Sequence, residues 1–250
     1  MTVYGRSRNP GPVDVGVLGF NPLAALSWRA AFWASDPAWA TRPAEGAGVA
    51  SWRNGGSFAS SATQGTGNAQ PVWSASSFAG KPGVTFDGTD DFLSLASVTG
   101  LNSTTLSVVS VFKMTSVSGT KVTSGLSGVE NRYTPAVISG AWYGRLRNGA
   151  GSTYITGGTA DTNAHLFTLI GRPTGTTLDM RFDGASVASS SSSDAVPDVP
   201  SPQTLYLGSD GGGGRGPMVL AFYGVYVGDV ETDANWGSFR AQMKAFYGLP

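Results

Sequence analysis

The segment GVTFDGTDDFLSL, residues 83–95, places three aspartates within five positions between two short apolar runs. Asp87-Gly88 favours a tight turn, because glycine tolerates the left-handed backbone and the side chains of Asp87 and Asp90 can accept backbone N–H groups. The segment therefore predicts a β-hairpin. The apolar residues expected on its two strands are Val84, Phe86, Phe92, Leu93 and Leu95.

The same aspartates have an alternative role, because Asp87, Asp90 and Asp91 supply the hard oxygens that calcium prefers. Calcium takes about six to eight oxygens in a specific loop order, and these three carboxylates do not form a calcium-loop sequence. A second Phe-Asp-Gly, residues 182–184, stands between another pair of strand-like runs, which favours the turn. We therefore predict no metal site and no cofactor, with calcium at the three aspartates as the alternative.

Composition limits the kinds of partner that this chain can have. Its 250 residues include 16 Lys and Arg, 16 Asp and Glu, and no Cys. Thiolate and disulfide chemistry are excluded, and neither sign of charge forms the run that would attract phosphates over a distance. The sequence also lacks a stretch of about 18 apolar residues or the apolar core of a signal peptide. We expect no nucleic-acid partner, no membrane insertion and no cleaved export signal.

Alternating apolar residues predict strands through the middle and end of the chain. In residues 105–114, TLSVVSVFKM, both faces are largely apolar, which predicts a central strand covered on both sides. In residues 177–183, the apolar residues are predicted to face in, and they alternate with Asp179, Arg181 and Asp183, which are predicted to face out. Further strands are predicted at residues 141–147, 165–171, 204–208 and 217–227.

The two ends of the domain have different patterns. Residues 20–73 are rich in tryptophan but broken by Gly, Pro and Ser. We predict loops and short strands there, held by buried indoles that each need a partner for the N–H group. Residues 231–246 repeat apolar side chains at intervals of three or four, which predicts a helix capped by Thr232 or Asp233 and ended by Gly248.

Many strands, frequent turns and one short C-terminal helix predict an all-β fold, and favour a two-sheet antiparallel sandwich over a barrel. Residues 1–19 follow no strand or helix period and predict an extended N-terminal arm. The sandwich domain is expected to span residues 20–250. Two segments of low complexity, SSSSS at 189–193 and GGGG at 211–214, predict mobile loops.

Four segments occur in a recognisable order: FNPLAALSWRAAFWASDP, VASWRNGGSFASSATQGTGNAQPVW, GKPGVTFDGTDDFLSL and FYGVYVGDVETDANWGSFRAQMKAFYGLP. Together they resemble the concanavalin A-like lectin/glucanase superfamily, specifically its laminin G-like domains. The resemblance covers about residues 20–250 and implies a jelly-roll sandwich of two antiparallel sheets, one of them curved. The matching residues are Trp33, Ser35, Asp36, Trp52, Arg53, Asn54, Phe86, Asp87, Gly88, Asp90, Asp91, Tyr247 and Gly248.

The acidic residues argue against an enzyme. A glucanase of this superfamily needs a Glu-x-Asp-x-x-Glu strand, whose two carboxylates flank the scissile bond. This chain has only Glu45, Glu130 and Glu231, and none lies in such a strand. The sole histidine, His165, has no Gly-x-Ser-x-Gly elbow and is predicted to be a strand-end residue with a satisfied hydrogen bond. Residues 211–217 lack the Lys-Ser/Thr of a phosphate-binding loop. We predict a non-enzymatic protein.

A ligand site is predicted on the water-facing side of residues 141–147. Carbohydrate recognition uses aromatic faces for sugar C–H groups and planar polar groups for sugar hydroxyls, and a protein partner is equally compatible with such residues. Arg215, in the glycine-rich loop, is a further contact for a partner or a glycan. The candidate ligand-binding residues are Tyr133, Tyr143, Arg145, Arg147, Tyr154 and Arg215.

Laminin G-like domains without a signal peptide are familiar on tailed-bacteriophage particles, and the resemblance implies a virion surface protein on the capsid or tail. We expect residues 1–19 to dock a homo-oligomer onto other virion proteins. The displayed domain would bind host-surface glycans or reinforce the particle. The alternatives are a free carbohydrate-binding module and a polysaccharide hydrolase with an atypical site.

Overall fold

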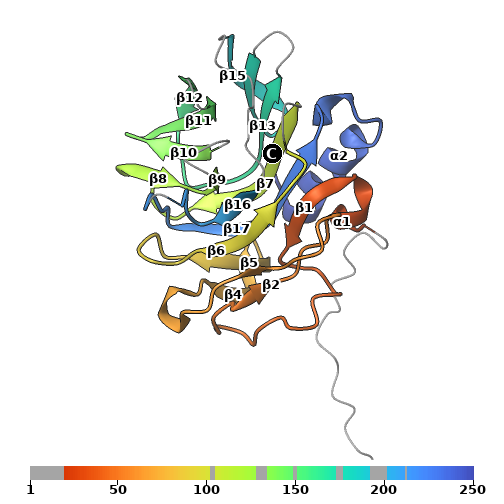
Figure 1. Ribbon diagram of the computed structural model, residues 1–250, viewed down its shortest axis with the longest axis vertical. Helices are drawn as coiled ribbons and strands as arrows, with labels where there is room; N and C mark the ends of the chain where they lie inside the picture. Colours follow the sequence, from red (N-terminus) through yellow and green to blue (C-terminus); the bar gives the residue numbers. More distant parts are fainter. Residues whose placement is uncertain are drawn as a thin grey trace, which may run out of the picture.

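The structure is a computed structural model, and it describes residues 20–101, 105–127, 134–148, 151–172, 177–191, 202–211 and 213–250. Within these ranges, antiparallel sheets pack face to face as a sandwich (Figure 1). The all-β prediction is therefore confirmed. The predicted arm, residues 1–19, lies outside the described residues.

One layer of the sandwich is an eight-stranded sheet. In spatial order its strands are β15 (Ala185–Ser191), β14 (Thr177–Phe182), β13 (Ala164–Arg172), β7 (Leu106–Met114), β17 (Met218–Val227), β5 (Lys81–Phe86) and β4 (Val72–Phe78), with β1 (Trp28–Trp33) also paired to β17. β17 is central because β7 pairs with one side of it, and β5 and β1 share the other. These bounds confirm the strands predicted at 105–114, 165–171, 177–183 and 217–227.

The other layer consists of two smaller sheets. The first contains β12 (Gly151–Thr159), β11 (Ala141–Asn148), β10 (Thr134–Ile138) and β8 (Thr120–Val122). The second contains β2 (Ser51–Trp52), β3 (Ala62–Thr63), β6 (Leu93–Val98), β16 (Gln203–Leu207) and β9 (Ser124–Ser127). Only Thr123 separates β8 from β9, and its N–H donates to Pro135 O at 3.1 Å while its carbonyl accepts from Gly208 N at 2.8 Å. The two smaller sheets therefore form one continuous layer across Thr123. The sandwich has the two layers that were predicted, but one of them is divided into two sheets.

The main core lies between the two layers. Trp142 of β11 packs edge-on against Phe112 of β7, with ring centroids 5.7 Å apart, and in a tilted arrangement against Phe182 of β14, with centroids 4.7 Å apart. β7 is buried on both faces, as predicted, because Val108 belongs to this core while Val109 belongs to a second cluster on the outer face of the large sheet.

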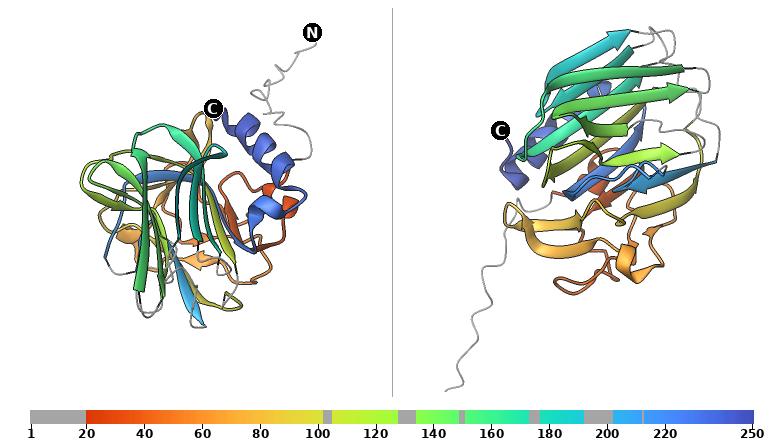
Figure 2. Two further views of the ribbon diagram at one scale, coloured as in Figure 1. Left: turned by 90° about the horizontal axis from the view of Figure 1, so that it is seen from above. Right: turned by 90° about the vertical axis from the view of Figure 1, so that its left-hand side faces the viewer.

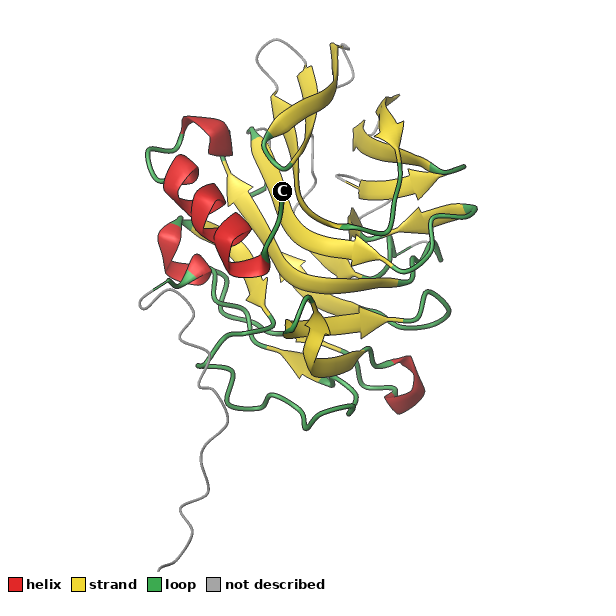
Figure 3. Ribbon diagram, turned by 180° about the vertical axis from the view of Figure 1, so that it is seen from behind, coloured by secondary structure: helices red, strands yellow, loops and turns green. Residues whose placement is uncertain are grey.

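Helices cover that outer face. The described residues form two α-helices, α1 (Pro22–Ala25) and α2 (Trp236–Tyr247), and two short 3₁₀ helices, η1 (Gly67–Ala69) and η2 (Val230–Thr232). α1 and α2 lie together on one side of the molecule (Figures 2 and 3). The hydroxyl of Tyr247, at the end of α2, accepts a hydrogen bond from Trp33 Nε1 at 3.0 Å and lies 3.4 Å from Ala221 O. The helix is thus fixed to the sheet by buried polar contacts as well as by packing.

The indoles of residues 20–73 are buried and their N–H groups are satisfied, which confirms the prediction. Each of these hydrogen bonds joins the indole to a residue at least six positions away along the chain. The acceptors are Pro22 O for Trp28, Tyr247 Oη for Trp33, Ser51 O for Trp39, Trp33 O for Trp52 and Ala34 O for Trp73.

The turn at residues 87–92 connects the two layers, so the predicted hairpin is wrong. β5 pairs within the large sheet and β6 within the five-stranded sheet. The turn chemistry is as predicted for Asp87, whose Oδ1 accepts from Thr89 N at 2.7 Å. The second cap is Asp91, which accepts from Asp87 N at 2.9 Å, and not Asp90. Asp91 takes this role because it is 6% exposed and folded into the turn.

Two other predictions are wrong. Residues 189–191 extend β15 instead of forming a loop, because they pair with Leu178 and its neighbours on β14. The helix starts at Trp236 after Asn235, since Asp229 caps the separate 3₁₀ helix η2 and Asp233 accepts from Asn235 N. Its predicted end is confirmed by the left-handed backbone of Gly248, φ 64°.

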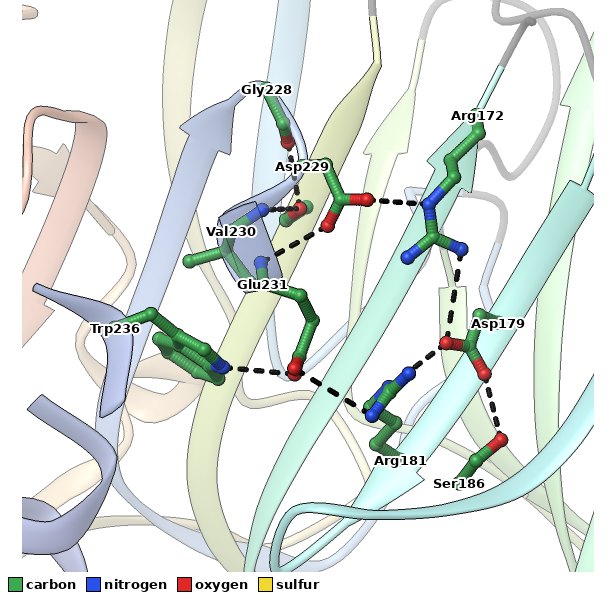
Figure 4. A network of polar contacts seen from close by, with 10 residues as sticks. Arg172, Asp179, Arg181, Ser186, Gly228, Asp229, Val230, Glu231 and Trp236 are labelled. Carbon is green, nitrogen blue, oxygen red and sulfur yellow. Dashed lines mark hydrogen bonds and ion pairs between the residues drawn. The ribbon is translucent and has the colours of Figure 1, made fainter. Parts of the chain in front are cut away.

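Asp179 lies on the outer face of the large sheet, as predicted, because Leu178 and Met180 face the core. It is nevertheless only 5% exposed. Its carboxylate lies 2.9 Å from Arg181 Nε and 3.8 Å from Arg172 Nη1 (Figure 4). Arg172 also contacts Asp229 at 2.5 Å, and Arg181 contacts Glu231 at 3.6 Å. Because the segment around η2 brings these acids over the outer face, the network is covered and the buried charge is paired.

Candidate functional site

The outer face of β11 and β12 brings together three of the predicted ligand residues. Trp142 of β11 faces the core. Tyr143 and Arg145 are an odd number of positions from Trp142 on the same strand, so they face outward. In the register of the two strands Arg145 lies opposite Tyr154. Its guanidinium carbon is 5.2 Å from the centre of the Tyr154 ring, and the Tyr143 and Tyr154 rings are 5.4 Å apart. The 47% exposure of Tyr154 leaves an aromatic surface open to a ligand.

These residues line a pocket of about 110 Å³, which we call the tyrosine pocket. Its lining contains both apolar and polar side chains, so it combines a surface for C–H groups with donors and acceptors for hydroxyls. Sequence reasoning missed Asp210, which belongs to the loop after β16. The lining residues are Thr120, Val122, Ala136, Ile138, Tyr143, Arg145, Tyr154 and Asp210.

Tyr143 stays a neutral phenol in this pocket. Its partial burial raises the pKa of the hydroxyl, and Tyr154 raises it further, while Arg145 acts in the opposite direction without cancelling the shift. A phenol is both a donor and an acceptor of hydrogen bonds, and the neighbouring guanidinium is a donor only. The pair can therefore bind a vicinal donor and acceptor such as two sugar hydroxyls.

Arg215 lies in a second pocket, of about 200 Å³, which we call the arginine pocket. Phe92, at the end of the turn, is half-buried and lines this pocket, with its ring centroid 6.0 Å from that of Tyr206. The arginine pocket is lined by Phe92, Ser94, Tyr206, Ser209, Gly211, Gly213 and Arg215.

The remaining predicted ligand residues are only partly placed. Tyr133 lies outside the described residues. Arg147 stands opposite Ser152 in the pairing of β11 with β12.

The aspartates of the turn form a close group, with one oxygen from each of Asp87, Asp90 and Asp91 lying within 4.8 Å of the others. Two of these carboxylates already accept backbone N–H groups of their own turn. Burial raises the pKa of Asp91 and the charges of Asp87 and Asp90 add to this, although a hydrogen bond from Asp87 N opposes it. The contacts account for the cluster as a turn, and calcium binding stays the alternative.

His165 is held between two carboxylates. Nδ1 lies 2.8 Å from Asp183 Oδ2 and Nε2 lies 2.9 Å from Asp161 Oδ1, which confirms the predicted structural role. Since both ring nitrogens contact carboxylates, neither is placed to activate a hydroxyl nucleophile. Of the glutamates in the described part of the chain, Glu45 accepts from Ala75 N and Glu231 accepts from Trp236 Nε1.

We expect His165 to make stability depend on pH. Burial lowers the pKa of its imidazole, but the hydrogen bonds and charges of Asp183 and Asp161 outweigh this and raise the pKa above its ordinary value. The charged form is thus favoured by folding, so its contribution is complete below an unfolded-state pKa of about 6.5 and is lost as pH rises through the folded-state pKa.

The measurement is the free energy of unfolding of the protein and of His165→Gln, between about pH 5.5 and about pH 8.5. The difference between the two should shrink as pH rises. Burial raises the pKa of Asp161, but hydrogen bonds from His165 and Asn163 outweigh this and lower it, so Asp161 titrates only in more acidic solution. A difference that is constant over this range would contradict the assignment.

Comparison with known proteins identifies the class of fold. No family model matches the chain, and no curated protein matches its sequence. The receptor-binding domain of botulinum neurotoxin C/D mosaic serotype aligns with a TM-score of 0.59 and 8% identity, over 90% of this chain and 55% of that chain. The botulinum neurotoxin serotype D ligand-binding domain in complex with N-acetylneuraminic acid aligns at 0.54 and 9%, over 92% and 56%.

Trypanosoma rangeli sialidase aligns with a TM-score of 0.57 and 13% identity, over 86% of this chain and 32% of that chain. The chain thus spans about half the length of the toxin domains and a third of the sialidase. At these identities the likeness shows the fold alone. That fold is an antiparallel β-sandwich. Among the described residues, every helix is too short or too polar to cross a bilayer.

Proposed function

We propose that this chain is a non-enzymatic, lectin-like domain that binds a glycan in the tyrosine pocket. The observation that carries the proposal is the packing of Arg145 and Tyr143 against Tyr154 on the exposed face of β11 and β12. Both rings are held by neighbours before a ligand arrives, which reduces the entropy lost on binding. The ligand-binding domain of similar fold in complex with N-acetylneuraminic acid supports a sugar as the class of ligand.

Replacing Tyr154 or Arg145 with alanine is expected to weaken glycan binding about tenfold or more, because a stacked aromatic or cation–π contact contributes on the order of 1–2 kcal/mol. The measurement is a glycan array followed by titration of the tightest glycan. Arg42→Ala is the matched control. Arg42, like Arg145, lies over an aromatic ring, with its guanidinium carbon 5.0 Å from the centre of the Trp73 ring, but it is on another surface.

Each array is run with calcium and with a chelator, and we expect equal binding because the proposal involves no cofactor. Binding that Arg145→Ala and Tyr154→Ala leave unchanged would refute the tyrosine pocket as the site. An array without any bound glycan would refute the function. Hydrolysis of a bound polysaccharide would instead favour the alternative of a hydrolase, for which the fold of the sialidase gives a precedent.

We further propose that the domain is displayed as a homo-oligomer on the capsid or tail of a bacteriophage and is docked there by residues 1–19. The support is the resemblance to laminin G-like virion proteins. Deleting residues 1–19 is expected to abolish association with the particle and to leave glycan binding unchanged. Particle purification followed by quantification of the protein is the measurement. Undiminished association would refute docking through this segment, and a free carbohydrate-binding module would then be the better account.

A further inference from the structure

The arginine pocket and the tyrosine pocket are neighbours. Ser209 and Gly211 line the first, and Asp210, the residue between them, lines the second. Consecutive Cα atoms are about 3.8 Å apart, so only the width of one residue separates the two pockets along this loop. The strands beneath them also adjoin, because β9 pairs with β16 and continues from β8 through Thr123 (Figure 1).

The arginine pocket repeats the chemistry of its neighbour. Phe92 and Tyr206 provide two ring surfaces, with centroids 6.0 Å apart. Ser94 lies opposite Tyr206 in the register of β6 and β16 and thus shares its face. The hydroxyl of Ser209 accepts from Gly211 N at 3.1 Å, which leaves its own proton to donate. Ring faces beside hydroxyls are again the groups that a sugar unit uses.

Arg215 makes this pocket different in charge. Its guanidinium carbon lies 5.6 Å from the centre of the Phe92 ring and Nη1 donates to Thr89 O at 3.2 Å, so the side chain is held in place. Nε is buried and makes no hydrogen bond within the described residues. No carboxylate of the described residues lies within ion-pair distance of Arg215, whereas the tyrosine pocket contains Asp210 beside Arg145.

The terminal nitrogens of this fixed guanidinium match the oxygens of a carboxylate. The nearby Asp87 and Asp91 accept backbone N–H groups of their own turn. We infer that the arginine pocket is a second subsite that takes a carboxylate-bearing sugar unit. This inference rests on the proposed function, and it makes the ligand an acidic oligosaccharide that spans both pockets.

The test uses oligosaccharides whose charge can be removed with little change of shape. The probes are trigalacturonic acid, 3′-sialyllactose and a glucuronic-acid-terminated disaccharide, each with its methyl ester. At least one acid is expected to bind tenfold or more tightly than its ester. Arg215→Gln should reduce binding of that acid to the level of the ester and leave the ester unaffected. Arg145→Ala should weaken both, and Arg42→Gln should weaken neither. Melting temperatures confirm that every variant is folded.

The outcomes separate the two claims. If acids and esters bind equally, or if Arg215→Gln changes nothing while Arg145→Ala still weakens binding, the second subsite is refuted and the proposed function stands. If none of these oligosaccharides and no array glycan binds, both are refuted. If a glutamate-rich peptide binds with dependence on Arg215 and the sugars do not, the pocket belongs to a protein partner and the inference is wrong.

Discussion

Replacing Trp28 with alanine is expected to lower the free energy of unfolding by about 3–5 kcal/mol. Trp28 is 2% exposed and its Nε1 donates to Pro22 O at 2.7 Å. Its ring packs against Phe222, Tyr226 and Phe239, with centroids 5.3, 6.1 and 5.4 Å away. One side chain thus joins the segment of α1, the strand β17 and the helix α2, and its removal leaves a cavity where the three meet.

Thermal and denaturant unfolding measure this effect, and we expect a fall in melting temperature of roughly 6–20 °C for a domain of this size. Val72→Ala is the control, because Val72 is an exposed apolar residue on β4 and its truncation should change stability by less than about 0.5 kcal/mol. A loss below about 1 kcal/mol in Trp28→Ala would show that the outer cluster does not hold the helix to the sheet.

Replacing Gly208 with alanine is expected to cost about 2–5 kcal/mol, from two causes that add. Gly208 has φ +81°, which an L-residue adopts only with strain. A Cβ there would also lie 2.2 Å from Cδ1 of the buried Phe86. Because Gly208 precedes the loop that separates the two pockets, glycan binding should weaken together with stability.

Gly46→Ala isolates the backbone contribution. Gly46 has φ +74° but no atom within 4 Å of the added methyl group. Its substitution should therefore cost only the strain of the left-handed conformation, about 1–2 kcal/mol. Equal losses in the two variants, measured by denaturant unfolding, would contradict close packing of Phe86 against Gly208.

Sequence reasoning predicted those features that depend on neighbouring residues. The alternation in 105–114 and 177–183 identified real strands, and Asp87 caps its turn through amides only two to four positions away. The motif residues also act structurally. Arg53 contacts Asp36 at 2.5 Å, and Asn54 Oδ1 accepts from Ala31 N at 2.8 Å, so these side chains fix loops of the fold.

The errors have a common cause, which is pairing between distant residues. The turn chemistry at Asp87 does not determine whether the flanking strands pair with each other, and both found partners elsewhere. Asp179 faces out of the sandwich, as its alternation predicted, but the alternation did not show that two arginines would join it to Asp229 and Glu231 in a network. The serines at 189–191 have the composition of a loop, but they form a strand because they pair with the neighbouring strand β14.

The candidate site was predicted only in part, because some of its residues come from distant segments of the chain. Tyr143 and Arg145 share a face of one strand, and that face followed from alternation. Asp210 and the pairing of Phe92 with Tyr206 were missed, because they come from segments that meet only when β6, β9 and β16 form one sheet. Arg215 was predicted alone, without the pocket around it.

The most direct test of the central claim is a crystal structure of the protein with the tightest-binding glycan from the array. We predict a sugar ring over Tyr154, with hydroxyls hydrogen-bonded to Arg145 and Tyr143. A glycan bound at another surface, such as the turn of Asp87 to Asp91, with the tyrosine pocket untouched, would contradict the account.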